Sequence, residues 1–143
     1  MPNTIWNESL EIGIPTIDRQ HKQLIEQMSL LVDAMRENRA NSEISKIINF
    51  LEKYIDLHFG FEEQCMESYR CPVACQNKEA HKKFVKNFRE IKAQFDREGS
   101  SLSLVLKVNQ SLLDWFLNHI RKIDTQLARS LVCDLKDKPS PTR

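Results

Sequence analysis

This 143-residue sequence is constrained most by four apolar stripes, each with the spacing of a helix and each carrying one histidine. In every stripe the apolar residues recur at intervals of three and four, which places them on one face of an α-helix. The connections between stripes are short, so neighbouring helices should run antiparallel. The pattern predicts an all-α protein, an antiparallel up-down-up-down four-helix bundle, with one histidine on the inner face of each helix. These histidines are His21, His58, His81 and His119.

The stripes also divide the chain into an arm, a helical domain and a tail. Glycine and proline interrupt the helical spacing before the first stripe, so residues 1–16 should form an ordered N-terminal arm, and Asp18 should be the N-cap of the first helix. Gly99 should end the third helix in a left-handed conformation. We expect a single domain over residues 1–131 and a polar, disordered tail over residues 132–143.

Composition excludes several classes of protein. The chain has 21 Lys and Arg against 20 Asp and Glu, interspersed, for a formal net charge of +1, so it lacks the basic surface of a nucleic-acid-binding protein. No stretch reaches the roughly 20 apolar residues that cross a bilayer, and the first residues lack the features of a signal peptide. We therefore expect a soluble, cytoplasmic protein without a nucleic-acid or membrane partner. The oligomeric state stays open, with a monomer favoured.

The cysteines are expected to be ordinary thiols. A chain of this size builds a core that has little need of disulfides. Cys71 and Cys75 have three residues between them and no second pair follows, which is a poor match to a zinc ribbon. The same expectation covers the other two cysteines, Cys65 and Cys133.

Two carboxylates accompany the histidines and indicate a buried metal centre. Glu62 lies four residues after His58, so the two side chains share one helix face. Asp124 lies five residues after His119, about 140° around an ideal helix, so joint ligation needs a local distortion such as a π-bulge or a terminating turn. A buried carboxylate without a partner is costly, and imidazole with carboxylate is a ligand set that suits iron. The alternative is a polar core in which the histidines are ordinary buried residues.

The same residues carry a resemblance to a known family. In order, over roughly residues 5–128, the chain contains WNESLEIGIPTIDRQHKQL, HFGFEEQCM, HKKF and WFLNHIRKIDTQL. These stretches resemble the hemerythrins, most closely the bacterial hemerythrins. The resemblance implies a four-helix bundle around two non-haem iron ions, bridged by two carboxylates and an oxo or hydroxo group, that binds O2 reversibly.

The resemblance also implies roles for particular residues. Glu62 and Asp124 look like the bridging carboxylates. His21 and His58 look like ligands of the iron that is left open for O2. An apolar pocket should protect the bound O2 there, and five residues are candidates for its wall, with plain core packing as the alternative for each. They are Leu24, Met28, Phe59, Trp115 and Ile120.

The other iron departs from the family pattern. His81 and His119 look like two of its ligands, but the family has a third histidine four residues before His81, where this chain has Asn77. Asn77 either donates its carbonyl oxygen, leaves a water in the gap, or merely caps the third helix. In each case we expect the second iron to be held more weakly.

The expected function is O2 storage, delivery or sensing by a protein that is not an enzyme. Two alternatives stay open because of Asn77. One is a di-iron enzyme, such as a peroxidase or a nitric oxide or O2 reductase, and the other is a metal-poor module for interaction or iron handling. A bis-histidine haem is disfavoured, because it leaves Glu62 and Asp124 unexplained and the sequence has no C-x-x-C-H motif.

Overall fold

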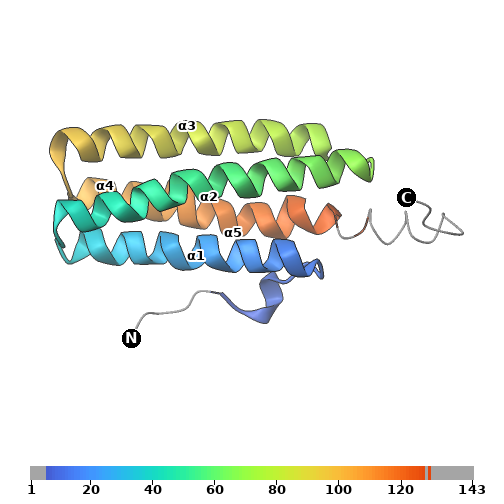
Figure 1. Ribbon diagram of the computed structural model, residues 1–143, viewed down its shortest axis with the longest axis horizontal. Coiled ribbons are helices and arrows are strands. Elements are labelled where there is room, and N and C mark those ends of the chain that lie inside the picture. The colour runs from blue at the N-terminus through green and yellow to red at the C-terminus, as the bar shows by residue number, and fades with distance from the viewer. Residues whose placement is uncertain (1–5, 128, 130–143) are drawn as a thin grey trace, which may run out of the picture.

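The computed structural model describes residues 6–127 and residue 129, and this part of the chain is helical without strands. Three long helices lie side by side with a fourth, and the chain runs up, down, up and down through them (Figure 1). The long helices are α1 (Pro15–Arg36), α2 (Asn41–Ser68) and α3 (Ala74–Glu98). The fourth is a continuous run of α4 (Leu102–Lys107), η2 (Val108–Asp114), α5 (Trp115–His119) and η3 (Ile120–Asp124). The predicted four-helix bundle is confirmed.

The start of α1 differs from the prediction. The helix begins at Pro15 and its N-cap is Ile14, because proline suits the first helical position, where its fixed φ and missing N–H cost little. Asp18 therefore lies in the first turn, and its carboxylate accepts backbone N–H bonds from Ile12 (2.8 Å) and Gly13 (3.2 Å). The predicted N-cap role of Asp18 was wrong, and the side chain instead ties the arm, which includes the short helix η1 (Glu8–Leu10), to the first helix.

The turn after α3 follows the prediction in the position of Gly99 and in its positive φ, whereas its ψ of −162° lies outside the left-handed helical region. Gly99 ends the helix with a φ of +73°, a backbone conformation that glycine adopts without steric cost. Ser101 then caps the fourth helix, because its hydroxyl accepts the backbone N–H of Leu104 at 3.1 Å. The short connection keeps α3 and the fourth helix antiparallel, as the sequence predicts.

The fourth helix is wider than an α-helix in two places. Both η2 and η3 are π-helical, and in a π-turn residues five apart come onto one face. The predicted distortion between His119 and Asp124 is confirmed by η3. The π-turn therefore lets both side chains of the five-residue pair face the interior.

The apolar stripes meet in one core, which surrounds the polar residues of the candidate site. None of the helices in the described part of the chain is both long and apolar enough to cross a membrane. Cys65, Cys71 and Cys75 are free thiols, as predicted. Cys133 and the predicted tail over residues 132–143 lie outside the described residues.

Candidate metal centre

The histidines and acids singled out in the sequence lie together inside the bundle. They come from α1, α2, α3, α5 and η3, and all are buried. They form two overlapping groups, within each of which one donor atom per residue lies within 4.8 Å of the others. The six residues are His21, His58, Glu62, His81, His119 and Asp124.

The first half of the centre is formed by His21 and His58 with both acids. His21 Nε2 lies 3.1 Å from Asp124 Oδ2 and 3.3 Å from Glu62 Oε2. His58 Nε2 lies 3.6 Å from the same Glu62 oxygen. The ring of Phe116 packs edge-on against His21, with 5.3 Å between ring centroids, so the first half is closed by an aromatic side chain.

The second half is formed by His81 and His119 with the same two acids. His81 Nε2 lies 3.2 Å from Glu62 Oε1, and His119 Nε2 lies 3.4 Å from Asp124 Oδ1. These are the acid oxygens that do not face His21. Each acid therefore presents one oxygen to each half.

Several atoms of the cluster have no hydrogen bond from the described residues. They are both ring nitrogens of His21, Nε2 of His58 and of His81, Oε2 of Glu62 and both oxygens of Asp124. Buried polar atoms are nearly always paired, since leaving them unpaired is costly. Metal ions in the centre would satisfy the carboxylate oxygens and the Nε2 atoms, though not Nδ1 of His21, and imidazole with carboxylate is a donor set that iron accepts. The side chains therefore fit a metal ion in each half.

The pKa values of the site residues, taken without a metal ion, show that the two buried acids need positive charge beside them. Burial opposes the charged form of His21, but the carboxylates of Asp124 and Glu62 outweigh it and raise its pKa to about 9. Burial lowers the pKa of His58 to about 3. Burial also opposes the charged form of Asp124, yet His119 and His21 hold the pKa of that carboxyl well below its usual range. The acids thus retain a proton on a neighbouring imidazole, and a metal ion would supply that charge instead and release protons.

Comparison with known proteins decides which family has this arrangement. A family model described as the Hemerythrin HHE cation binding domain matches residues 12–131. The chain belongs to the hemerythrin family. It is 33% identical over 124 residues to the bacteriohemerythrin of Pseudomonas paraeruginosa (strain DSM 24068 / PA7), which is 87% of this chain and 78% of that protein. The bacteriohemerythrin of Stenotrophomonas maltophilia (strain R551-3) is 32% identical over the same coverage. The myohemerythrin of Sipunculus nudus is 25% identical over 120 residues, 84% of this chain and 87% of that protein.

Asn77 stands where the hemerythrin resemblance predicts a histidine. The residue is fully buried and lies inside α3, which begins at Ala74 with Val73 as its N-cap. The alternative that Asn77 caps the third helix was therefore wrong, because the helix begins one turn earlier than its apolar stripe. The amide instead points into the centre.

The Asn77 amide connects two residues of the second half. Its Oδ1 lies 2.6 Å from His119 Nε2, and its Nδ2 donates to Glu62 Oε1 at 3.3 Å and to Met66 Sδ at 3.1 Å. A carboxylate accepts hydrogen bonds, so the amide nitrogen faces Glu62 and the amide oxygen faces the histidine. His119 Nε2 is then the donor of the 2.6 Å bond and carries a proton. A metal ion in the second half of this hemerythrin has to displace that proton.

Two side chains that the sequence analysis did not single out accept hydrogen bonds from histidines of the centre, on the side of each ring that faces away from the acids. Gln20 Oε1 accepts from His58 Nδ1, and Glu63 Oε2 accepts from His81 Nδ1, both at 2.8 Å. Each bond leaves Nε2 of the ring facing the centre. Gln20 was detectable as a polar residue on the first apolar stripe. Glu63 lies off the second stripe, and only the packing of α2 against α3 brings it to His81.

Two of the five predicted pocket residues stack on histidines of the second half. Four of the five are buried and Trp115 is half-buried; the buried ones are Leu24, Met28, Phe59 and Ile120. The ring of Phe59 lies parallel to that of His81, with 3.7 Å between centroids, and Trp115 stacks on His119 at 4.6 Å. Trp115 therefore lines the second half, and Phe59 contacts both halves, because its ring centroid also lies 5.7 Å from that of His58. Phe116, which was not singled out, lines the first half.

Proposed function

We propose that this protein is a non-haem di-iron protein that binds O2, for storage, delivery or sensing rather than catalysis. Each half of the centre would hold one iron, with the two shared acids as bridges. One observation carries this proposal: both buried acids present one oxygen to each half, beside four imidazole Nε2 atoms of which three lack hydrogen bonds from the described residues. The fourth, His119 Nε2, is bonded to Asn77. Membership of the hemerythrin family supports the same assignment.

The first half is the proposed place for O2. It offers two imidazole nitrogens and two carboxylate oxygens, which leaves coordination positions open for a small ligand. Bound ferrous iron would supply the electrons that O2 takes up. His21 and His58 are fully buried, and Phe116 packs against both, with centroid distances of 5.3 and 6.1 Å. We propose that Phe116, with the buried Leu24, Met28 and Ile120, keeps water out.

The second half is proposed to hold its iron more weakly. Asn77 stabilises the form of His119 in which Nε2 carries a proton, and this form cannot ligate a metal through Nε2, the nitrogen that faces the centre. The amide oxygen is also a weaker donor to iron than the imidazole that it replaces. Iron binding there has to break the 2.6 Å bond between Asn77 and His119, so the two ions should bind with unequal affinity.

A second candidate is a di-iron enzyme, such as a peroxidase or a nitric oxide or O2 reductase. A groove of about 490 Å³ is lined by Trp115, His119 and Lys122 among others. The groove brings solvent close to the second half, where a weakly held iron would have room for another reactant. Steady consumption of a reductant would distinguish this function from O2 carriage.

Iron content and colour test the proposal together. Protein loaded with ferrous iron without oxygen should bind more than one iron per chain, and aeration should give a visible colour that disappears again when O2 is removed. Irreversible bleaching with turnover of a reductant would favour the enzyme. A chain that binds no iron under these conditions would overturn both candidates and leave the metal-poor module.

A further inference from the structure

His58 and His81 have outer hydrogen-bond partners of opposite character. The partner of His58 is Gln20, a neutral and buried amide, whereas the partner of His81 is the carboxylate of Glu63, whose side chain is 27% exposed. Both bonds join the partner oxygen to Nδ1 at 2.8 Å. One histidine in each half is therefore held through Nδ1 in the same geometry. The first half uses a neutral, buried group, and the second half uses a charged group at the surface.

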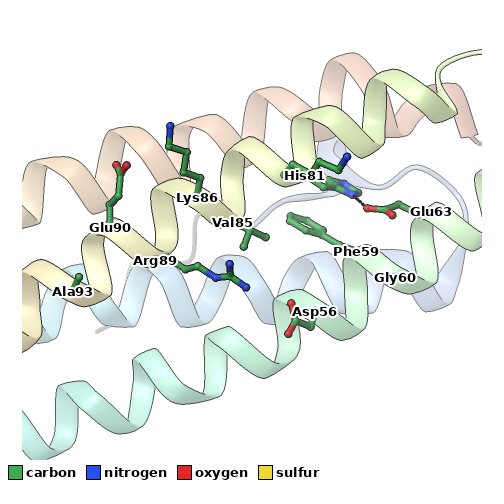
Figure 2. Close-up of a pocket in the computed structure, with 11 residues that line it drawn as sticks. Asp56, Phe59, Gly60, Glu63, His81, Val85, Lys86, Arg89, Glu90 and Ala93 are labelled. Carbon is green, nitrogen blue, oxygen red and sulfur yellow. Dashed lines mark hydrogen bonds and ion pairs between the residues drawn. The ribbon is translucent and has the colours of Figure 1, made fainter.

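Glu63 reaches His81 from a groove between α2 and α3. Figure 2 shows Glu63 on α2 pointing at the His81 ring, with Phe59 beside that ring. The groove has a volume of about 720 Å³, and Lys86 and Arg89 of α3 line it further along. Water in the groove can thus contact Glu63, while the imidazole behind it stays buried.

Two contacts together fix the His81 ring. Phe59 lies parallel to it, with 3.7 Å between centroids and an interplanar angle of 0°, which fixes the plane of the ring. The Glu63 bond fixes the direction of Nδ1 within that plane. Nε2 then points to the centre, 3.2 Å from Glu62 Oε1.

The two carboxylates compete for the single proton of a neutral imidazole. Glu63 is closer to the ring, at 2.8 Å, and makes a hydrogen bond, whereas His81 Nε2 makes none with the described residues. A proton held on Nδ1 leaves the lone pair of Nε2 free to bind a metal.

We propose that Glu63 is a positioning residue that sets the tautomer and the orientation of His81 for metal binding in the second half. The inference rests on the proposed function, in which His81 is a ligand. A carboxylate also makes the imidazole a stronger donor than a neutral partner does. Glu63 therefore supports the same half in which Asn77 replaces a histidine.

The first measurement needs no metal. Imidazole ¹⁵N NMR of the metal-free protein at pH 9, where an ordinary imidazole is neutral, reports which ring nitrogen of His81 carries the proton. Wild type should show the proton on Nδ1. In E63L the nearest remaining carboxylate is Glu62, so the proton should move to Nε2. E90Q removes a charge from the same groove without touching His81, and it should behave as wild type.

The second measurement is an anaerobic titration with Co²⁺, whose visible absorption reports each binding step. E63L should weaken the second step by about 10- to 100-fold, the usual effect of losing an outer partner of a ligand, and leave the first step unchanged. E63Q keeps an acceptor oxygen without the charge, so its second step should lie between those of wild type and E63L.

The outcomes separate this inference from the function on which it rests. A His81 proton that stays on Nδ1 in E63L, or an E63L titration like that of wild type, would overturn the role of Glu63 while leaving the di-iron proposal intact. A wild-type chain that binds no Co²⁺ and no iron, but whose His81 proton moves in E63L, would overturn the di-iron proposal and confirm the orienting role alone. If E63L does not fold, an E63Q titration equal to that of wild type counts against the role of the charge.

Discussion

The two halves of the centre share their acids but differ in how their histidines are held. In the first half, His21 and His58 are fully buried and the outer partner is the neutral Gln20. No hydrogen bond from the described residues occupies His21 Nε2 or His58 Nε2. The coordinating nitrogens of the first half therefore have no competing hydrogen bond from the described residues, and a metal ion there has only to displace the proton that the acids retain on His21.

In the second half one of the two coordinating nitrogens already has a hydrogen bond, and the other belongs to a ring with a charged outer partner. His119 Nε2 is engaged by Asn77, and His81 depends on a charged partner at the surface, Glu63. On the proposed function, one pair of acids would serve two metal positions of unequal affinity, because the neighbours of the histidines differ between the halves. The variants that follow are expected to remove, reduce or change this difference in metal affinity between the two halves.

Replacing a shared acid should have the largest effect, since it removes both halves at once. We expect E62A to bind no iron. Its unfolding free energy should be about 3–5 kcal/mol below that of iron-loaded wild type, the usual cost of breaking a buried charge pair. Iron analysis and thermal melting measure the two effects. The control is E67A, at an exposed position of the same helix. Equal melting temperatures of loaded wild type and E62A would contradict a structural role for the centre.

Removing one histidine from each half should separate the two ions. We expect H58A to weaken the tighter ion by more than about 100-fold, because losing a ligand costs more than losing an outer partner, and to abolish the colour change on aeration. H119A should keep one iron per chain. Titrations with ferrous iron measure both. If H58A and H119A lose the same ion to the same extent, the halves are not independent in the way described.

Placing a histidine at position 77, where the family has one, should reduce the difference in metal affinity between the two halves. N77H removes the bond that holds a proton on His119 and adds a nitrogen donor, so the second ion should bind about 10-fold more tightly, which equals about 1.4 kcal/mol. Oxidation of the aerated protein should also slow. N49H places a histidine on the exposed surface of α2 and serves as the control. Unchanged iron content in N77H would show that position 77 does not ligate.

Loss of the neutral outer partner should have an effect no larger than that of N77H. Q20L removes the acceptor of His58 Nδ1, and we expect the first binding step to weaken by about 10-fold. The effect should be smaller than that of E63L on the second step, because an amide holds an imidazole less strongly than a carboxylate does. Co²⁺ titration measures it, with Q64L at an exposed position as the control. A weakened second step in Q20L would show that the outer partners act across both halves.

The parts predicted correctly from the sequence are those that depend on spacing along one helix. The interval of four between His58 and Glu62 placed them on one face, and the interval of five between His119 and Asp124 demanded the distortion that η3 provides. Helical periodicity likewise predicted the bundle. These features depend on the spacing of residues along one helix, which can be read from a single sequence.

The parts that could not be predicted depend on contacts between helices or on helix ends. Glu63 meets His81 only because α2 packs against α3. The role of Asn77 depended on where α3 begins, and an apolar stripe does not mark that residue. Asp18 was misassigned because Pro15 starts α1 before the stripe does.

The division of oxygens between the halves has a thermodynamic consequence. Since Glu62 and Asp124 each face both halves, an ion in one position changes the charge and the freedom of the groups that receive the other. Linkage then requires that each ion alter the affinity of its neighbour by the same factor. Filling of the two positions is therefore a coupled equilibrium, in which the affinity measured for one ion depends on whether the other position is occupied.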